Sequence, residues 1–286
     1  MKELKRRFVY HMWVPDVINE DQRNIIKVHI SCIKRFIKQF NDIIIILAYD
    51  NNINAVNKLK HIFIDLIEID EQSITIKICK NTAFREATTA KEYIYSLDKN
   101  PYDELIFFGH SKGLNNLNSD EITNKNSLDS NFENISLWVV SMYYYNLFFE
   151  AEVDRVMTQS CYYGFLLLID NFKMWMYAGS FYWINRNALI TYSKQVFHTY
   201  NNLFNAIDKT YAETTPNNLI SLADFYFISS HNNYYFPAGS NISNVNMYTN
   251  SKYYIRECSG SQEDYKNFID FYNSILDEIK IYDIDI

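Results

Sequence analysis

Five consecutive residues, Gly109-His110-Ser111-Lys112-Gly113, bring together the side chains of this chain that are best suited to chemistry. A lysine ammonium neutralises phosphate charge, and a histidine donates a hydrogen bond or a proton. The flanking glycines matter because the chain has only 6 glycines in 286 residues, so each is expected where the backbone needs it. The segment is therefore suited to binding a diphosphate through His110 and Lys112.

The same segment also matches G-x-S-x-G, the nucleophile elbow of α/β-hydrolases, with Ser111 as the nucleophile. In that fold a helix follows the serine at once, whereas residues 114–120 are rich in asparagine and typical of a loop. The later histidines are His198 and His231, and Asp224 closely precedes the second of them. A serine esterase that uses Ser111 therefore stays an alternative.

Strands and helices are expected to alternate up to this segment. The run of β-branched residues at 43–47 is typical of a strand that is buried on both faces of a parallel sheet. Strands are predicted over 8–14, 42–50, 74–79 and 104–108, and helices over 21–40, 53–63 and 85–97. This order predicts an α/β fold with a mainly parallel sheet and helices on both faces. Ligands bind at the carboxyl ends of such strands, where Asp50 and the segment 109–113 lie.

The second half of the chain is less regular. A polar loop is expected over 114–134, followed by a helix from 135 to about 159. Further strands are expected over 163–169 and 175–184, the second broken at 178–180, and helices over 187–204 and 262–279. No clear linker divides the chain, which predicts a single domain over 1–286.

Several segments, in order, resemble a group of glycosyltransferase-like proteins linked to bacterial and viral surface polysaccharides. The segment His110-Ser111-Lys112-Gly113 resembles the H-[ST]-K-G motif of that group. Four more segments are similar to the group's opening strand, its tryptophan-bearing helix, its S-G-N-F-W-W segment and its Y-x-A-E-T stretch: residues 8–11, 137–144, 177–185 and 211–216. The resemblance covers about residues 8 to 216 and leaves 217–286 uncovered.

The resemblance implies a GT-A-like (Rossmann-like) domain, with a nucleotide-sugar-binding half over 1–113 and an acceptor-binding half over 114–286. Its activity would be the transfer of a sugar from a nucleotide sugar, such as a UDP- or GDP-sugar, to a glycan or another hydroxyl acceptor. A non-catalytic glycan-binding domain of the same fold is a further alternative.

The resemblance also distributes roles over the site residues. Glu213 is expected to be the general base that deprotonates the acceptor, because an inverting transferase needs one carboxylate there. Lys112 and His110 are the other expected catalytic residues. The expected donor-binding residues are Asp50, Arg85, Glu86, Gly109, Ser111 and Gly113, and the expected acceptor-binding residues are Gly179, Ser180, Tyr182 and Trp183.

Metal dependence is expected to be weak or absent. GT-A enzymes that use a divalent ion hold it with a D-x-D motif, and the one such motif here is Asp283-Ile284-Asp285 at the very end of the chain. Glu68-Ile69-Asp70 is acidic but falls on another element. We therefore expect Lys112 and His110 to neutralise the leaving diphosphate.

Composition limits the partners and the compartment. A net charge of -7 argues against a nucleic-acid partner. Four widely spaced cysteines fit a reducing compartment, and we expect a cytoplasmic protein. The apolar stretch 8–14 is too short for a signal peptide, and the run 137–149 is too short to span a membrane. No transmembrane segment is expected, which leaves peripheral membrane contact open.

Overall fold

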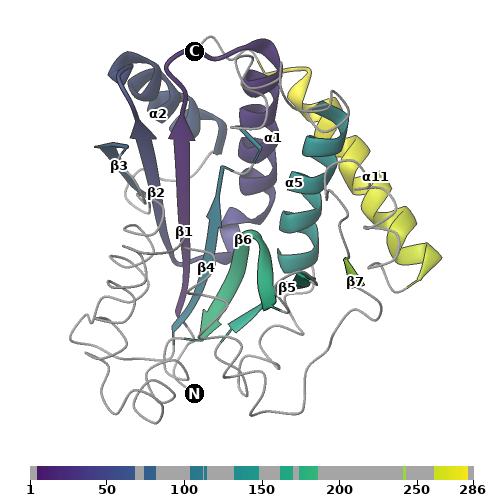
Figure 1. Ribbon diagram of the computed structural model, residues 1–286. Coiled ribbons are helices and arrows are strands. Elements are labelled where there is room, and N and C mark those ends of the chain that lie inside the picture. Colours follow the sequence, from purple (N-terminus) through teal and green to yellow (C-terminus); the bar gives the residue numbers. More distant parts are fainter. Residues whose placement is uncertain are drawn as a thin grey trace, which may run out of the picture.

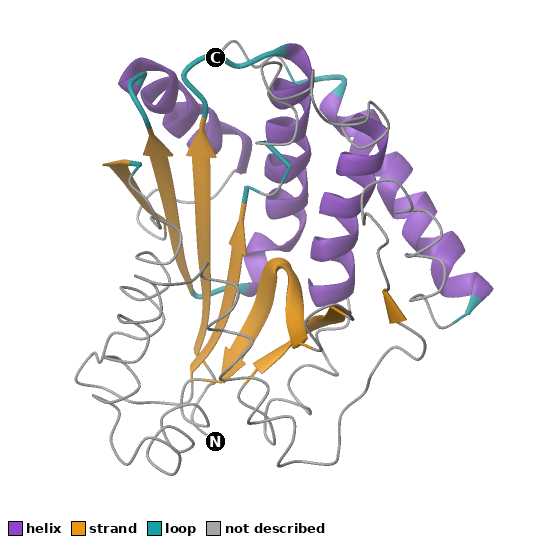
Figure 2. Cartoon of the chain, in the orientation of Figure 1, coloured by secondary structure: helices purple, strands orange, loops and turns teal. Residues whose placement is uncertain are grey.

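The structure is a computed structural model that describes residues 5–67, 74–81, 104–111, 113–114, 132–147, 162–169, 174–185, 241–242 and 261–282. A central sheet lies beside a layer of helices (Figures 1 and 2). In chain order the elements are β1 (Lys5–Val14), α1 (Glu20–Phe36), the short 3-10 helix η1 (Ile37–Gln39), β2 (Asp42–Tyr49), α2 (Ile53–Ile67), β3 (Ile74–Lys80), β4 (Glu104–His110), α5 (Phe132–Leu147), β5 (Tyr162–Ile169), β6 (Met174–Asn185), β7 (Asn241–Ile242) and α11 (Gln262–Ile279).

The strands form one sheet in the order β3-β2-β1-β4-β6-β5-β7. The first four neighbours, β3, β2, β1 and β4, are all parallel. β6 runs antiparallel to both β4 and β5, and β7 is parallel to β5. The predicted α/β fold with its parallel sheet is confirmed, and the four predicted strands lie within a few residues of the observed ones.

Local sequence signals explain where the two best-defined helices begin. At the start of α1, the Asn19 side chain accepts from the Gln22 backbone N–H at 2.8 Å, and the Gln22 side chain accepts from the Asn19 N–H at 3.1 Å. This reciprocal capping box satisfies two N–H groups that a helix start leaves unpaired. At the start of α11, Ser261 caps the N–H of Asp264.

The described helices cover one face of the sheet. Every second residue of β1, from Phe8 to Val14, packs into the core that α1, α2, α5 and α11 share. The buried face of α11 consists of Phe268, Tyr272, Ile275 and Ile279, as its spacing predicts. Because α11 packs on α1 and α5, residues beyond the resemblance belong to the same core.

The opposite face of the sheet is buried as well. Val9 and Ile106 are 0% exposed, and Phe108 is 1% exposed, although their side chains point away from the helix layer. This burial fits the β-branched composition of the strands. The helix predicted over 85–97 lies outside the described residues, so helices on this second face stay a prediction.

The interruption predicted at 178–180 is found in the pairing rather than in the strand itself. β6 is continuous from Met174 to Asn185, but its register with β5 shifts between Gly164 and Leu166. Gly164 pairs with Tyr182 and Leu166 pairs with Tyr177, so residues 178–181 lie opposite a single β5 position. Extra residues of this kind bend a strand, and Figure 1 shows β6 curving over.

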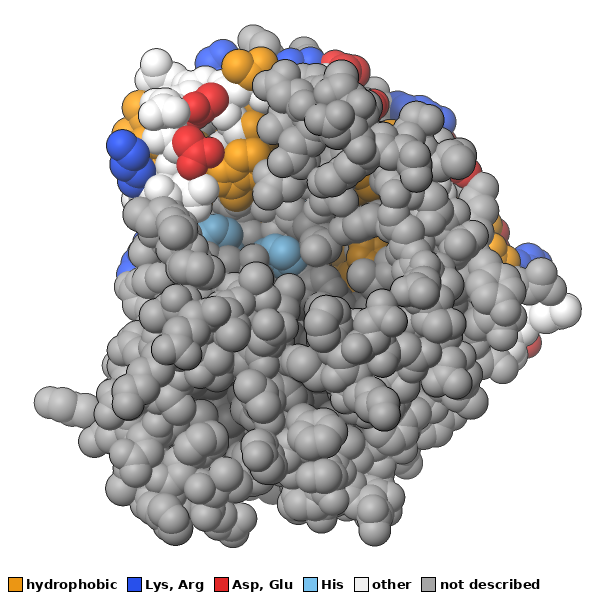
Figure 3. Space-filling view, in the orientation of Figure 1, with side chains coloured by type: hydrophobic (Ala, Val, Ile, Leu, Met, Phe, Trp, Pro, Cys, Tyr) orange, Lys and Arg blue, Asp and Glu red, His pale blue; other side chains and the backbone are white. Residues whose placement is uncertain are grey.

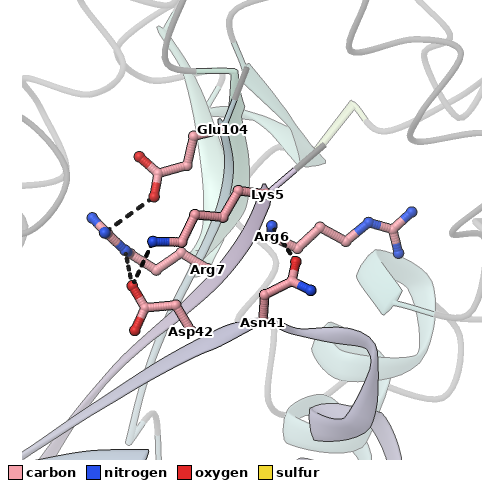
Figure 4. A network of polar contacts seen from close by, with 6 residues as sticks. All are labelled: Lys5, Arg6, Arg7, Asn41, Asp42 and Glu104. Carbon is pink, nitrogen blue, oxygen red and sulfur yellow. Dashed lines mark hydrogen bonds and ion pairs between the residues drawn. The ribbon is translucent and has the colours of Figure 1, made fainter. Parts of the chain in front are cut away.

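At the amino ends of the parallel strands, one arginine joins three strands (Figure 4). Arg7 of β1 donates to Asp42 of β2 at 2.8 Å and lies 3.2 Å from Glu104 of β4. The side chains of Arg7 and Glu104 are only 12% and 7% exposed. Lys5 approaches the same Asp42 carboxylate at 3.5 Å from the solvent side. We call this set, Lys5, Arg7, Asp42 and Glu104, the amino-edge network.

None of the helices within the described ranges is both long enough and apolar enough to cross a membrane.

Candidate functional site

Ser111 joins the ends of β4 and β1 at the opposite, carboxyl edge of the sheet. Its backbone N–H donates to the His11 carbonyl at 2.9 Å, and its Oγ accepts from the Trp13 N–H at 2.9 Å. Both bonds tie the residue that follows β4 to β1, and Ser111 is buried at this strand end. A residue predicted to bind the donor is thereby shown to be held by β1.

Asp50 lies at the same edge, and each of its two carboxylate oxygens accepts a hydrogen bond from a side chain. The Trp13 Nε1 donates to its Oδ2 at 2.8 Å, and the Asn81 Nδ2 donates to its Oδ1 at 2.9 Å. Asn81 is itself fixed, because its backbone N–H donates to the Tyr49 carbonyl. The ends of β1 and β3 thus orient the carboxylate at the end of β2. We call Trp13, Asp50 and Asn81 the aspartate clamp.

Two histidines lie side by side near this clamp. His11 of β1 and His110 of β4 are register partners in the parallel ladder, so strand alternation places both on the face opposite the helix layer, together with Trp13. His11 is only 4% exposed. Figure 3 shows histidine side chains in a hollow of the molecular surface.

Packing explains both glycines of the motif. A Cβ at Gly109 would lie 3.1 Å from the Phe181 ring, which packs over that position. Gly113 has a φ of 97°, in the region that favours glycine, and a Cβ there would lie 2.4 Å from Cγ2 of Ile135. The glycines were predicted to let the backbone approach phosphates, and close packing already accounts for their identity.

The chain is anchored on both sides of Lys112. On one side Ser111 is bonded to β1, and on the other the Leu114 carbonyl accepts from Gln22 Nε2 at 3.0 Å. Leu114 is fully buried. Lys112 itself lies outside the described residues. The described residues on either side of position 112, Ser111 and Leu114, are thus each bonded to the N-terminal part of the chain.

The helix N-termini at this edge are capped by the chain's own side chains. The capping box of Asn19 and Gln22 closes α1, and Asn52 Oδ1 accepts from the Ala55 N–H at 3.1 Å at the start of α2. Asp16 accepts from the N–H groups of Asn51 and Asn52 at 2.7 and 2.8 Å. Hydrogen bonds from Asn51, its side chain first, hold the pKa of Asp16 below its usual value. These internal partners already take N–H groups that helix starts otherwise offer to phosphate.

A buried layer supports the motif from the helix side. Tyr143 of α5 meets Phe181 edge-on with centroids 5.0 Å apart, and its OH lies 3.0 Å from Nδ1 of His29 on α1. Burial raises the pKa of Tyr143 and of Tyr10, so both stay neutral. This layer holds Phe181 against Gly109, and the Phe181 ring also lies 5.9 Å from the His110 ring at the end of β4.

The predicted acceptor-binding residues fall into two groups, three whose backbone alone is described and one whose side chain is buried. Gly179, Ser180 and Tyr182 lie on β6, where only their backbone is described, and Tyr182 pairs with Phe108 of β4. Trp183 is 0% exposed and stacks on Phe40 at 5.5 Å. Strand alternation turns the Trp183 ring into the helix-side core, and the acceptor role expected for it stays a prediction.

The remaining predicted residues, Arg85, Glu86 and Glu213, lie outside the described residues. Within the part of the chain that the structure does describe, no group of three or more His, Cys, Asp or Glu side chains is arranged to hold a metal ion.

Sequence reasoning missed three residues of the site: Trp13, Asn81 and His11. Each is separated from its partner by tens of positions in the sequence, 98 in the case of Trp13 and Ser111. The available signal was the parallel order of the strands, which brings residues at the ends of neighbouring strands together.

Comparisons of the chain with protein-family models, with curated proteins and with solved structures find no match. The architecture defines the class of the protein as α/β, with a four-stranded parallel sheet of order 3-2-1-4 and helices packed against it. This order is compatible with a Rossmann-like topology.

Proposed function

We propose that this protein is a glycosyltransferase of the GT-A type that transfers a sugar from a nucleotide sugar to a glycan or another hydroxyl acceptor. The observation that carries the proposal is the aspartate clamp beside the motif segment 109–113, both at the carboxyl edge of a parallel sheet. Ligands of open α/β sheets bind at this edge. A carboxylate there suits the hydroxyl and N–H groups of a nucleoside.

The strand order supports the same proposal. A parallel 3-2-1-4 sheet that is extended by an antiparallel strand is the arrangement expected of a GT-A-like domain, and β6 is such a strand. Since one fold hosts many functions, the site residues have to carry the functional argument.

The capping contacts at the helix starts also favour one orientation of the nucleotide-sugar donor along the carboxyl edge. The Asn19–Gln22 capping box and the Asp16 contacts occupy N–H groups at the starts of α1 and α2. A diphosphate is then better bound at the end of β4, where His110 lies and which Lys112 follows in the sequence. We propose that the nucleoside lies toward Asp50 and the diphosphate toward the motif.

In the proposed reaction, the acceptor oxygen attacks the anomeric carbon and gives its proton to Glu213. The bond between that carbon and the phosphate oxygen breaks, and its electron pair leaves with the nucleoside diphosphate. Lys112 neutralises the charge that develops there, which is the step that electrostatic stabilisation speeds most.

The contacts of Ser111 give the esterase alternative no support. Its Oγ accepts from the Trp13 N–H and is thereby tied to β1, whereas the serine of a nucleophile elbow exposes its Oγ at the top of the sheet. The glycan-binding alternative differs from the enzyme only in lacking nucleotide binding and turnover.

A thermal-shift screen with UDP-, GDP- and other nucleotide sugars tests the proposal, in the presence of EDTA or manganese. We expect one nucleotide class to raise the melting temperature, in EDTA as well as in manganese. A ligand that binds only the folded state at a hundredfold its Kd stabilises by about 2.7 kcal/mol. Stabilisation by glycans alone would favour the binding domain, and labelling of Ser111 by a fluorophosphonate would favour the esterase.

A further inference from the structure

At the carboxyl edge the fold brings together two imidazole side chains, His11 and His110, which are 99 positions apart in the sequence. Register pairing sets His11 beside His110, and neighbouring strands lie about 4.8 Å apart. Both side chains lie on the face of the sheet that also carries Trp13, whose indole N–H donates to Asp50. The pair thus lies on the same face as the Trp13 side of the aspartate clamp, and His110 comes two positions before Lys112 in the sequence.

We infer that His11 and His110 together bind the diphosphate of a nucleotide donor, so that His11 is a further ligand-binding residue of this site. The inference rests on the proposed function. Two imidazole N–H donors at strand spacing can reach different oxygens of one diphosphate, and charge-assisted hydrogen bonds are about twice as strong as neutral ones.

During transfer of the sugar, the histidine pair would stabilise the charge that develops on the leaving diphosphate. When the bond between the anomeric carbon and the phosphate oxygen breaks, the electron pair moves onto the diphosphate. His11 and His110 donate hydrogen bonds to its oxygens, while the acceptor proton goes to the general base. Donors fixed on two paired strands need no rearrangement as that charge develops, which is the condition for electrostatic stabilisation.

A phosphate ligand fits the pair better than a metal ion does. A protein metal site commonly offers three or more side-chain ligands, and no such group of His, Cys, Asp or Glu exists among the described residues. The capped helix starts beside the site leave phosphate binding to the end of β4.

Isothermal titration with inorganic pyrophosphate, UDP, GDP, uridine and guanosine tests the pair. The variants are His11→Gln and the matched control His61→Gln, an exposed histidine on α2. We expect His11→Gln to weaken pyrophosphate and nucleoside diphosphate binding about tenfold or more, with nucleoside binding unchanged, because charge-assisted bonds are lost. His61→Gln should bind as the wild type does.

Unchanged pyrophosphate affinity in His11→Gln would overturn the inference, and turnover of a nucleotide sugar by the wild type would still leave the proposed function standing. Stoichiometric zinc binding to the wild type that His11→Gln loses, with pyrophosphate binding intact, would overturn it in favour of a metal site. If the wild type binds neither nucleotides nor pyrophosphate, the inference and the proposed function both fail.

A measurement on the wild-type protein covers the case in which His11→Gln does not fold. Pyrophosphate added to protein labelled with nitrogen-15 at its 6 histidines should shift two imidazole signals, one of them missing in His110→Gln. Shifts of no imidazole signal, or of only one, would contradict the pair.

Discussion

The two edges of the parallel sheet use charged side chains in opposite ways. At the amino edge, two cations, Arg7 and Lys5, face two carboxylates, Asp42 and Glu104, so the charges neutralise one another within the protein. At the carboxyl edge, Asp50 is oriented by two neutral donors, Trp13 and Asn81, and its charge is not neutralised by them.

This difference separates groups that stabilise the fold from groups that suit a ligand. An ion pair with little exposure mainly avoids the cost of a lone buried charge. A carboxylate held by neutral donors keeps its negative charge and a defined direction. Substitutions at the amino edge should therefore change stability, and substitutions at the carboxyl edge should change binding and turnover.

Among the substitutions at the carboxyl edge, Lys112→Ala should reduce donor binding and turnover most. We expect turnover to be abolished and donor affinity to fall by about 2–3 kcal/mol, because a charge-assisted phosphate contact is lost. Calorimetry with the nucleotide sugar measures the affinity, and Lys266→Ala, an exposed lysine of α11, serves as the control. Unchanged donor affinity in Lys112→Ala would contradict the assignment.

Glu213→Gln should separate the chemical step from donor binding. Loss of a general base lowers a rate by about 10²–10⁴, so we expect turnover at least a hundredfold lower with near-normal donor affinity. Steady-state kinetics and calorimetry together measure both, with Glu263→Gln at the exposed start of α11 as the control. Normal turnover would move the test to Asp224→Asn, and then to a mechanism without a dedicated base.

Arg7→Met, at the amino edge, should lower the stability of the fold without changing donor binding at the carboxyl edge. Removing one partner of a nearly buried ion pair costs about 3 kcal/mol, since Glu104 loses its positive partner. Urea unfolding measures this loss, and donor affinity should stay unchanged. Lys5→Met removes the exposed partner of the same Asp42 and should cost less than about 1 kcal/mol. Equal losses in both variants would refute the role given to burial.

Asp50→Asn should weaken donor binding about tenfold, because an amide offers one acceptor oxygen to the two donors of the clamp and loses the charge. The melting temperature should change little. Asp65→Asn, at an exposed position of α2, is the matched control. Donor affinity equal to that of the wild type would remove Asp50 from the site.

Glu278→Gln should have the smallest effect, on the docking of α11. Burial by itself raises the pKa of Glu278, but hydrogen bonds from Tyr282 and Arg35 outweigh it and lower that pKa below its usual value. The stabilisation is therefore present at neutral pH and is lost as the pH falls through the folded-state pKa. We expect a loss of about 0.5–1 kcal/mol at pH 7.

Thermal melts of Glu278→Gln and wild type at neutral and at acid pH measure this effect. The difference between the two proteins should vanish in acid, where Glu278 is protonated. A difference that persists in acid would show that the variant acts through packing rather than through charge.

Much of the fold could be predicted because its signals are local. The spacing of Phe268, Tyr272, Ile275 and Ile279 defines the buried face of α11 within a single helix, and the β-branched run of β2 identifies a buried strand. The position of the motif at the end of β4 followed from the same strand pattern. The chain order of strands and helices then predicted a parallel sheet, since parallel neighbours require crossover connections.

The composition of the site depended on contacts that only the folded chain makes. Whether Trp183 faces an acceptor or the core is decided by the partner it stacks on, Phe40. The glycines of the motif are explained by Phe181 and Ile135, which the sequence does not place near them.

The sequence by itself determined the four parallel strands, their order along the chain and the presence of a polar motif after a buried strand, because periodicity and turn residues act over a few positions. The tertiary structure decided which strand ends meet: it set His11 beside His110 and turned Trp13 and Asn81 onto Asp50. The physical reason is that strand register is a property of the sheet, and a shift of one residue would turn every side chain of a strand to its other face.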